Sequence, residues 1–270
     1  MVANTITART PACLFNSFNF DFDELRRQRR PGCRMVHRMD GPIDVYRGTA
    51  EGHDARIHAL NLELADATVF QSRYSLERHR ELGLEFRAPV VIPNAVDPAI
   101  FHPWGREPAA SGRRVRLIAT SWSDNPRKGG PTLQWLDAHL DWGRYSMTFV
   151  GRTRHRFTNI RQTPPLASAP LARLLRAHDV YIAASQDDPC SNALLEALAC
   201  GLPALYLRSG GHPELVGEAG LSYDTPQEIP NRLDHLVASY ATYQSRIATP
   251  SIEATASAYL AVCIGFVFPS

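Results

Sequence analysis

Lysine is almost absent from this sequence. Lys128 is the single lysine among 29 basic residues, and all the others are arginine. An arginine side chain ends in a planar fork, whereas a lysine side chain ends in a compact point charge. Because every other basic residue is arginine, the lysine at position 128 indicates a place where the planar fork does not fit. Composition alone therefore makes Lys128 a candidate site residue.

Cysteine is also scarce, and its spacing argues against two kinds of stabilising site. The chain has five cysteines, an odd number, and no two of them form a C-x-x-C pair. We therefore expect neither a disulfide framework nor a zinc site. The positions are Cys13, Cys33, Cys190, Cys200 and Cys263.

Long apolar runs are missing as well. No window is long enough to span a bilayer, and the N-terminus lacks the apolar stretch of a signal peptide. Hydrophobic residues make up 44% of the chain, which is enough for real cores. We expect a globular cytoplasmic protein. The net charge of +2 is too small to indicate a nucleic-acid partner.

One basic cluster near the N-terminus has two interpretations. It is either a solvated face or a surface for peripheral contact with anionic lipid at the inner face of a membrane. Its members are Arg26, Arg27, Arg29, Arg30, Arg34 and Arg38.

Strand-like and helix-like segments alternate along the chain, which indicates an α/β fold with parallel sheets. No G-x-G-x-x-G motif opens the chain, so a dehydrogenase-type nucleotide site is not indicated. A proline-rich stretch followed by G-R-E-P-A-A-S-G-R-R predicts a linker. We therefore expect a first domain over 1–111, a second over 112–250, and a terminal helix within 251–270.

The most informative stretch runs from Val180 to Pro203 and predicts a strand, a polar turn and a helix capped by Ser191. A helix that begins after such a turn presents unpaired N–H groups, which bind anions such as phosphate. Two acids, Asp188 and Glu196, lie in the turn and in the helix. Carboxylates beside a phosphate are best explained as acceptors for hydroxyls of the same ligand. This combination predicts a nucleotide sugar.

At these residues the chain resembles retaining glycosyltransferases of family 4, the glycosyl transferases group 1. Their E-x7-E signature appears with Asp188 as the first acid and Glu196 as the second, followed by E-A-L-A-C-G-L-P and G-G-H-P-E. The resemblance covers most of Thr68 to Asp224. It implies a GT-B fold, in which two Rossmann-like doubly wound domains face each other across a cleft. The first domain would be the acceptor side, in abbreviated form.

The resemblance also implies roles for individual residues. Arg127 and Lys128 would hold the donor diphosphate, Asp188 would contact the sugar, and Glu196 the ribose. His37 would approach the sugar from the first domain, although a histidine at the end of a strand that bonds only to its own surroundings is an equally good interpretation. The predicted catalytic residues are His37, Lys128 and Asp188. The remaining donor-binding residues are Gly151, Arg152, Ser191, Asn192 and Ala193.

The function implied is transfer of a hexose from a UDP- or GDP-linked sugar to a glycan, lipid-linked or small-molecule acceptor, with retention of configuration. We expect no cofactor and no metal, because the cations and helix N–H groups can stabilise the leaving diphosphate. Two alternatives stay open. A catalytically weak partner subunit is favoured by the short first domain and by Asp188 in place of Glu. A nucleotide-sugar epimerase is disfavoured because no added acid/base set is visible.

Overall fold

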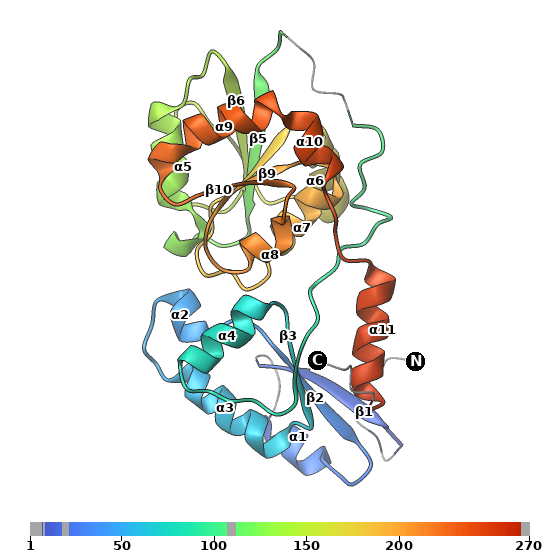
Figure 1. Ribbon diagram of the computed structural model, residues 1–270. Coiled ribbons are helices and arrows are strands. Elements are labelled where there is room, and N and C mark those ends of the chain that lie inside the picture. Colours follow the sequence, from blue (N-terminus) through green and yellow to red (C-terminus); the bar gives the residue numbers. More distant parts are fainter. Residues whose placement is uncertain (1–6, 8, 18–21, 107–111, 266–270) are drawn as a thin grey trace. The chain divides into compact units, whose positions relative to one another are not determined.

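The computed structural model describes residues 7, 9–17, 22–106 and 112–265. The chain forms two compact units, each with its own parallel sheet (Figure 1). The first unit consists of Met1–Asn94 together with Glu253–Ser270, and the second of Ala95–Ile252. The expected α/β class with parallel sheets is confirmed.

The first unit is built on four parallel strands that follow chain order across the sheet, β1-β2-β3-β4. No reversal of direction occurs among these described strands. The strands are β1 (Ala12–Asn16), β2 (Arg34–Met39), β3 (Ala67–Phe70) and β4 (Pro89–Val91), and the helices are α1 (Phe22–Gln28), α2 (Ile43–Arg47), α3 (His53–Leu64), α4 (Arg73–Glu81) and α11 (Ile252–Cys263).

Alternate residues of these strands face opposite layers of helix. Leu60 of α3 packs with Phe15 and Met35 on one face, whereas Val262 of α11 packs with Val36 on the other. Because side chains alternate along a strand, odd-numbered residues of β2 face α3 and even-numbered ones face α11. This alternation therefore decides which face of the sheet each side chain of β2 points to, up to the carboxyl end of the strand.

The second unit has six parallel strands whose order reverses in the middle, β10-β9-β8-β5-β6-β7. From β5 the chain passes outward through β6 and β7. It then returns to the other side of β5 and forms β8. The strands are β5 (Val115–Ser121), β6 (Tyr145–Gly151), β7 (Arg161–Thr163), β8 (Val180–Ala183), β9 (Ala204–Leu207) and β10 (Gly220–Tyr223). The doubly wound arrangement expected from the sequence is therefore present in this unit.

Helices cover both faces of the second sheet (Figure 1). Helices α6 (Ser168–Arg176), α7 (Asn192–Ala199) and α8 (His212–Val216) pack on one face, and α5 (Gly130–His139) and α9 (Ile229–Ala238) pack on the other. A shorter helix, α10 (Tyr240–Ser245), follows α9, and single turns of 3-10 helix occupy Pro126–Lys128 and Pro226–Glu228. Both faces are thus buried, as a parallel sheet requires.

The division between the units differs from the expected boundary. Ser111 lies outside the described residues, but the units already divide after Asn94. The segment that follows Asn94 joins the second unit because Phe101 is 6% exposed and lies in the same apolar cluster as Leu198 of α7. Helix α11 belongs to the first unit, where the Nε of Arg34 donates a hydrogen bond to the carbonyl of Val262 at 2.7 Å.

The basic cluster of the first unit is engaged within the protein. Each of its six arginines donates to an acceptor of the same unit. The acceptors are Glu63 for Arg26, Glu24 for Arg27, the Glu63 carbonyl for Arg29, the Thr7 carbonyl for Arg30, the Val262 carbonyl for Arg34 and Asn94 for Arg38. Within the described ranges, no helix combines the length and hydrophobicity needed to cross a membrane.

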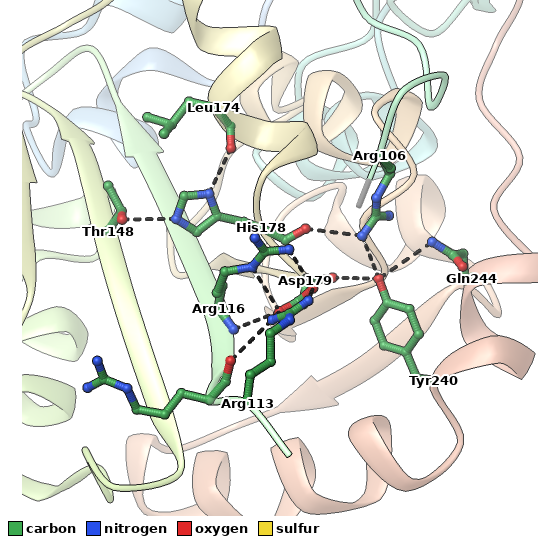
Figure 2. Close-up of polar contacts among 10 residues, drawn as sticks. Arg106, Arg113, Arg116, Thr148, Leu174, His178, Asp179, Tyr240 and Gln244 are labelled. Carbon is green, nitrogen blue, oxygen red and sulfur yellow. Dashed lines mark hydrogen bonds and ion pairs between the residues drawn. The ribbon is translucent and has the colours of Figure 1, made fainter. Parts of the chain in front are cut away.

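A buried carboxylate fixes the amino-terminal ends of β5 and β8. Asp179 directly precedes β8 and is 1% exposed. It accepts two hydrogen bonds from Arg113, at 2.6 and 2.8 Å, and one from the backbone N–H of Arg116, at 2.8 Å. Figure 2 shows both arginines directed at this carboxylate. Burial opposes ionisation of Asp179, but these hydrogen bonds outweigh it and hold the pKa of the carboxyl below its ordinary value.

The same network reaches α10 and the segment that precedes β5. The Tyr240 hydroxyl donates to the carbonyl of Asp179 at 3.0 Å and accepts from Arg106 at 2.7 Å (Figure 2). Arg106 also donates to the carbonyl of His178 at 3.0 Å. The start of β8 is therefore tied to β5, to α10 and to the chain entering the unit.

We predict that Asp179→Ala strongly destabilises the second unit. Removing the buried carboxylate leaves two half-buried guanidinium groups without their counter-charge, and breaking a buried ion pair costs about 3–5 kcal/mol. Asp224→Ala is the matched control, because its ion pair with Arg208 has both side chains 56% exposed, and exposed pairs contribute at most about 1 kcal/mol. Chemical denaturation of both variants tests this, and equal losses of unfolding free energy would contradict it.

Candidate functional site

The predicted donor residues gather where the order of the second sheet reverses. Strands β5 and β8 are neighbours although two strands, two α-helices and a turn of 3-10 helix separate them in the chain. Loops that leave the carboxyl ends of such strands form the ligand crevice of doubly wound sheets. Three loops meet at this edge, and we call them the β5 loop (122–129), the β8 loop (184–191) and the β9 loop (208–211).

Ion pairs join the β5 loop to the β8 loop. The Nζ of Lys128 lies 2.8 Å from an oxygen of Asp188, and the side chains are only 20% and 10% exposed. Arg127 pairs with Asp187 beside it. The backbone N–H of Gln186 also donates to the carbonyl of Arg127 at 2.7 Å. The structure therefore brings together Arg127, Lys128 and Asp188, as the sequence predicts.

Backbone contacts join the β8 loop to the β9 loop. The N–H of Gly211 donates to the carbonyl of Asp188 at 2.8 Å, and the N–H of Asp187 donates to the Ser209 hydroxyl at 2.9 Å. Gly210 has a φ of +63°, and a Cβ there would lie 2.3 Å from the Asp188 carbonyl oxygen. Only glycine permits this approach, so the G-G pair serves to hold the β8 loop in place.

His212 also holds the β8 loop in place. Its side chain is buried, and its Nδ1 lies 3.0 Å from the carbonyl of Leu207, which can only accept. The Nδ1 therefore carries the proton, and Nε2 accepts from the Ser185 hydroxyl at 3.0 Å. Burial lowers the pKa of His212, so the ring is neutral. His212 is therefore a structural residue that joins the β8 loop to the end of β9.

Helix α7 begins at the end of the β8 loop. The Ser191 hydroxyl accepts from the N–H of Leu194, which is the N-cap predicted from the sequence. Asn192 and Ala193 form the first turn, and Asn192 is exposed. The positive end of the helix dipole therefore lies immediately after Asp188.

Glu196 differs from Asp188 in its surroundings. Its carboxylate has no hydrogen-bond or ion-pair partner among the residues that the structure describes. Burial raises its pKa to about 7, because the charged form loses hydration that no cation replaces. A half-buried carboxylate in this condition gains from hydroxyl donors on a ligand.

Gly151 and Arg152 lie at the carboxyl end of β6, beside the β5 loop. A Cβ on Gly151 would lie 1.8 Å from the carbonyl oxygen of Ser121, so the adjacent strand explains this glycine. The guanidinium of Arg152 lies over the ring of Trp122, 5.7 Å from its centroid. Lys128 and Arg152 both line one small pocket, together with residues such as Ser123, Asn125 and His155.

Comparison with known proteins identifies a sequence family and a shared fold. The sequence model of a family described as Glycosyl transferases group 1 matches residues 143–239. The resemblance to glycosyl transferases group 1 is confirmed. The matched segment contains the β8 loop, α7 and the β9 loop, and thus both acids of the signature. Among curated protein sequences, none matches the chain.

Solved structures with the same fold are numerous. Sucrose-phosphate synthase from Thermosynechococcus elongatus is similar with a TM-score of 0.74 and 18% identity, covering 93% of this chain and 72% of that one. HepE of Anabaena, in complex with UDP and glucose, has a TM-score of 0.66 and 17% identity, covering 84% and 67%. The catalytic domain of starch synthase IV from Arabidopsis thaliana, bound to ADP and acarbose, has a TM-score of 0.67 and 13% identity, covering 87% and 67%. The fold is GT-B.

The structure places His37 differently from the catalytic interpretation. His37 is an odd-numbered residue of β2, so it points at α3 and is 0% exposed. Asn61 of α3 donates to its Nδ1 at 3.0 Å, which leaves Nε2 to donate to the Ser17 hydroxyl at 3.2 Å. The ring also stacks on Phe15, with centroids 4.5 Å apart. A side chain enclosed in this way has no surface for a sugar, so we leave His37 out of the site.

Sequence reasoning missed the residues that hold the β8 loop, namely Asp187, Ser185 and Ser209. Their contacts come from segments that are distant in the chain. One signal was available for Asp187, because the Asp-Asp pair precedes proline and aspartate tolerates the left-handed backbone that it adopts here, with a φ of +53°.

We predict that His37 makes the stability of the first unit fall in acid. Burial lowers the pKa of His37 to about 3, whereas its ordinary value is 6.5. Below pH 6.5 the unfolded chain binds a proton that the folded unit excludes, so stability is lost from about pH 6.5 toward about pH 3, by about 1.4 kcal/mol per unit. His37→Gln should flatten this slope in denaturation curves between pH 6 and pH 4. The exposed His235→Gln should not, and an unchanged slope in His37→Gln would refute the assignment.

Proposed function

We propose that this chain is a retaining glycosyltransferase that moves a hexose from a UDP- or GDP-linked sugar to a hydroxyl of a glycan, lipid-linked or small-molecule acceptor. The observation that carries the proposal is the pairing of Lys128 with Asp188 at the switch point of the second sheet, directly before α7. Ligands of such sheets bind at this place. The family match over 143–239 supports the reaction class, and placement in the cytoplasm is part of the same proposal.

The donor diphosphate would be held by Lys128, Arg127 and the first turn of α7. Both cations are already positioned by acids of the β8 loop. A phosphate that approaches them adds negative charge, which the N–H groups after Ser191 and the helix dipole would stabilise. These groups would also stabilise the charge that develops on the leaving diphosphate, so the proposal requires no metal and no cofactor.

Asp188 and Glu196 would bind different parts of the donor. Asp188 is anchored in the loop through its carbonyl, and its carboxylate would receive sugar hydroxyls when the diphosphate takes over Lys128. Glu196 would receive ribose hydroxyls, which supply the hydrogen bonds that its carboxylate lacks within the described protein. Arg152 lines the pocket that Lys128 also lines, so Arg152 and the preceding Gly151 would lie along the nucleotide.

The ligands of structurally similar proteins support a nucleotide-sugar donor. HepE of Anabaena is seen in complex with UDP-glucose as well as with UDP, and starch synthase IV of Arabidopsis thaliana with ADP. These complexes share a nucleoside diphosphate and differ in base. For this chain we retain UDP- and GDP-linked sugars as the donors to test.

A catalytically weak, donor-binding partner subunit remains the second candidate. The observation that favours it is the burial of His37, which removes the group that the first unit was expected to contribute to the sugar. Binding without fast turnover separates this candidate from an autonomous transferase.

The first test combines donor binding and turnover in Lys128 variants. We expect wild-type protein to bind UDP or GDP in calorimetry and to release nucleoside diphosphate from the matching sugar donor. Lys128→Arg should lose nearly as much of both as Lys128→Ala, because a planar fork does not fit beside the 10%-exposed Asp188. Arg232→Lys is the control and should change neither, because Arg232 forms a partly exposed pair with Glu228 and belongs to none of the three loops.

Three outcomes decide between the candidates. Absence of binding by any nucleotide or nucleotide sugar would contradict the donor site. Binding without sugar transfer or hydrolysis would favour the partner subunit. Full activity in Lys128→Arg would refute the argument from the fit of the lysine.

The second test uses the pKa of Glu196, which burial raises to about 7. If ribose hydroxyls bind its ionised form, affinity for UDP-glucose should be full above pH 7 and fall about tenfold per unit below it. UDP-glucose suits this test because it has no phosphomonoester that titrates near pH 6. Glu196→Gln should bind more weakly at pH 8 and show no such dependence between pH 5.5 and pH 8. A variant with the wild-type pH profile would exclude Glu196 as the cause.

A further inference from the structure

A closed ring of four side chains stands at the carboxyl edge of the first sheet. Arg38 and Asp40 come from the end of β2, Gln71 follows β3, and Asn94 follows β4. The strands are parallel neighbours, so their carboxyl ends meet at one edge although the four residues are far apart in sequence. The parity that turns His37 toward α3 places Arg38 on the other face of β2, and Asp40 directly follows the strand.

Hydrogen bonds connect every member of the ring to the next. Gln71 donates through Nε2 to Oδ1 of Asp40 and accepts through Oε1 from Asn94 at 2.9 Å. Arg38 donates to Oδ1 of Asn94 at 3.0 Å and to Oδ1 of Asp40 at 3.4 Å. The carbonyl of Asp40 accepts from the Ser75 hydroxyl at 3.0 Å, which ties it to α4.

One carboxylate oxygen of the ring is left over. Gln71 is 4% exposed and uses both ends of its amide inside the ring and on the Met39 carbonyl. The Asp40 side chain is 46% exposed, and its Oδ2 has no hydrogen-bond partner among the described parts of the chain. A carboxylate held by one oxygen, with the other facing solvent, is preorganised to accept a hydrogen bond from a ligand.

The charges of the ring select the kind of ligand. Arg38 and Asp40 carry opposite charges and lie 3.4 Å apart, so the ring as a whole is neutral. The outward oxygen repels a phosphate or carboxylate, and the adjacent guanidinium repels a cation. A neutral hydroxyl is the donor that suits this position, because a hydrogen bond to an ionised acceptor is stronger than one between neutral groups.

We propose that Asp40 binds a hydroxyl of a neutral carbohydrate at the carboxyl edge of the first sheet. The inference rests on the proposed function in one respect, namely that this carbohydrate is the acceptor of the transfer. Arg38, Gln71 and Asn94 are positioning residues that fix the carboxylate. The first unit thereby contributes a sugar-binding residue where His37 does not.

Saturation-transfer NMR on the full chain tests this with methyl α-D-glucopyranoside, maltose and sucrose as probes. Wild-type protein should bind at least one of them, and Asp40→Asn should bind it about tenfold more weakly, since about 1.4 kcal/mol separates a charged from a neutral acceptor. The amide keeps an acceptor for Gln71, so the ring and the melting temperature should survive. Asp23→Asn, whose carboxylate is 75% exposed on α1, is the control and should bind as wild type does.

Titration with UDP on the same proteins separates this inference from the proposed function. Asp40→Asn should bind UDP as wild type does, and Asp188→Asn should retain the Asp40-dependent sugar signal. Sugar binding through Asp40 without any nucleotide binding would overturn the proposed function alone. Equal sugar binding by wild type and Asp40→Asn, or no binding of any probe sugar, would overturn this inference alone.

Discussion

The pairing of β5 with β8 is the constraint on which the second unit depends. These strands meet only because the sheet reverses its order there, and the pairing is secured at both ends. At the amino end, the buried carboxylate of Asp179 holds Arg113 and the start of β5. At the carboxyl end, Lys128 and Asp188 join the two loops. Helix α7 therefore starts at a fixed place relative to the only lysine of the chain.

The cations of the site are balanced by acids in the structure, and this has a consequence for ligand binding. In the proposed complex, a diphosphate would share or take over Lys128 and Arg127 from Asp188 and Asp187. The exchange conserves hydrogen bonds for the cations and frees the acids to accept hydroxyls. One ligand that carries both phosphate and hydroxyl groups would serve the cations and Asp188 together, whereas free phosphate would bring no hydroxyl for Asp188. The proposed site would therefore favour a nucleotide sugar over a simple anion.

Local sequence patterns predicted the second unit well. The helix expected from Asn192 is observed at Asn192–Ala199, its Ser191 cap is formed, and Lys128 lies beside Asp188. These features follow from short-range rules for caps, from strand and helix periodicity, and from the edge at which parallel strands end.

Long-range packing accounts for what the sequence did not predict. His37 lies near the end of β2, but its burial follows from the parity of that strand and from Asn61 on a distant helix. The division after Asn94 depends on Phe101 joining the core of the second unit. The ring around Asp40 unites the ends of three strands, and no local motif marks it.

The most direct measurement is a structure of this chain determined with UDP-glucose bound. The account predicts that the diphosphate contacts Lys128 and the first turn of α7, that Glu196 accepts ribose hydroxyls, and that Asp188 has turned from Lys128 toward the sugar. A nucleotide bound elsewhere, or one bound here while Glu196 contacts no hydroxyl and Lys128 no phosphate, would contradict it.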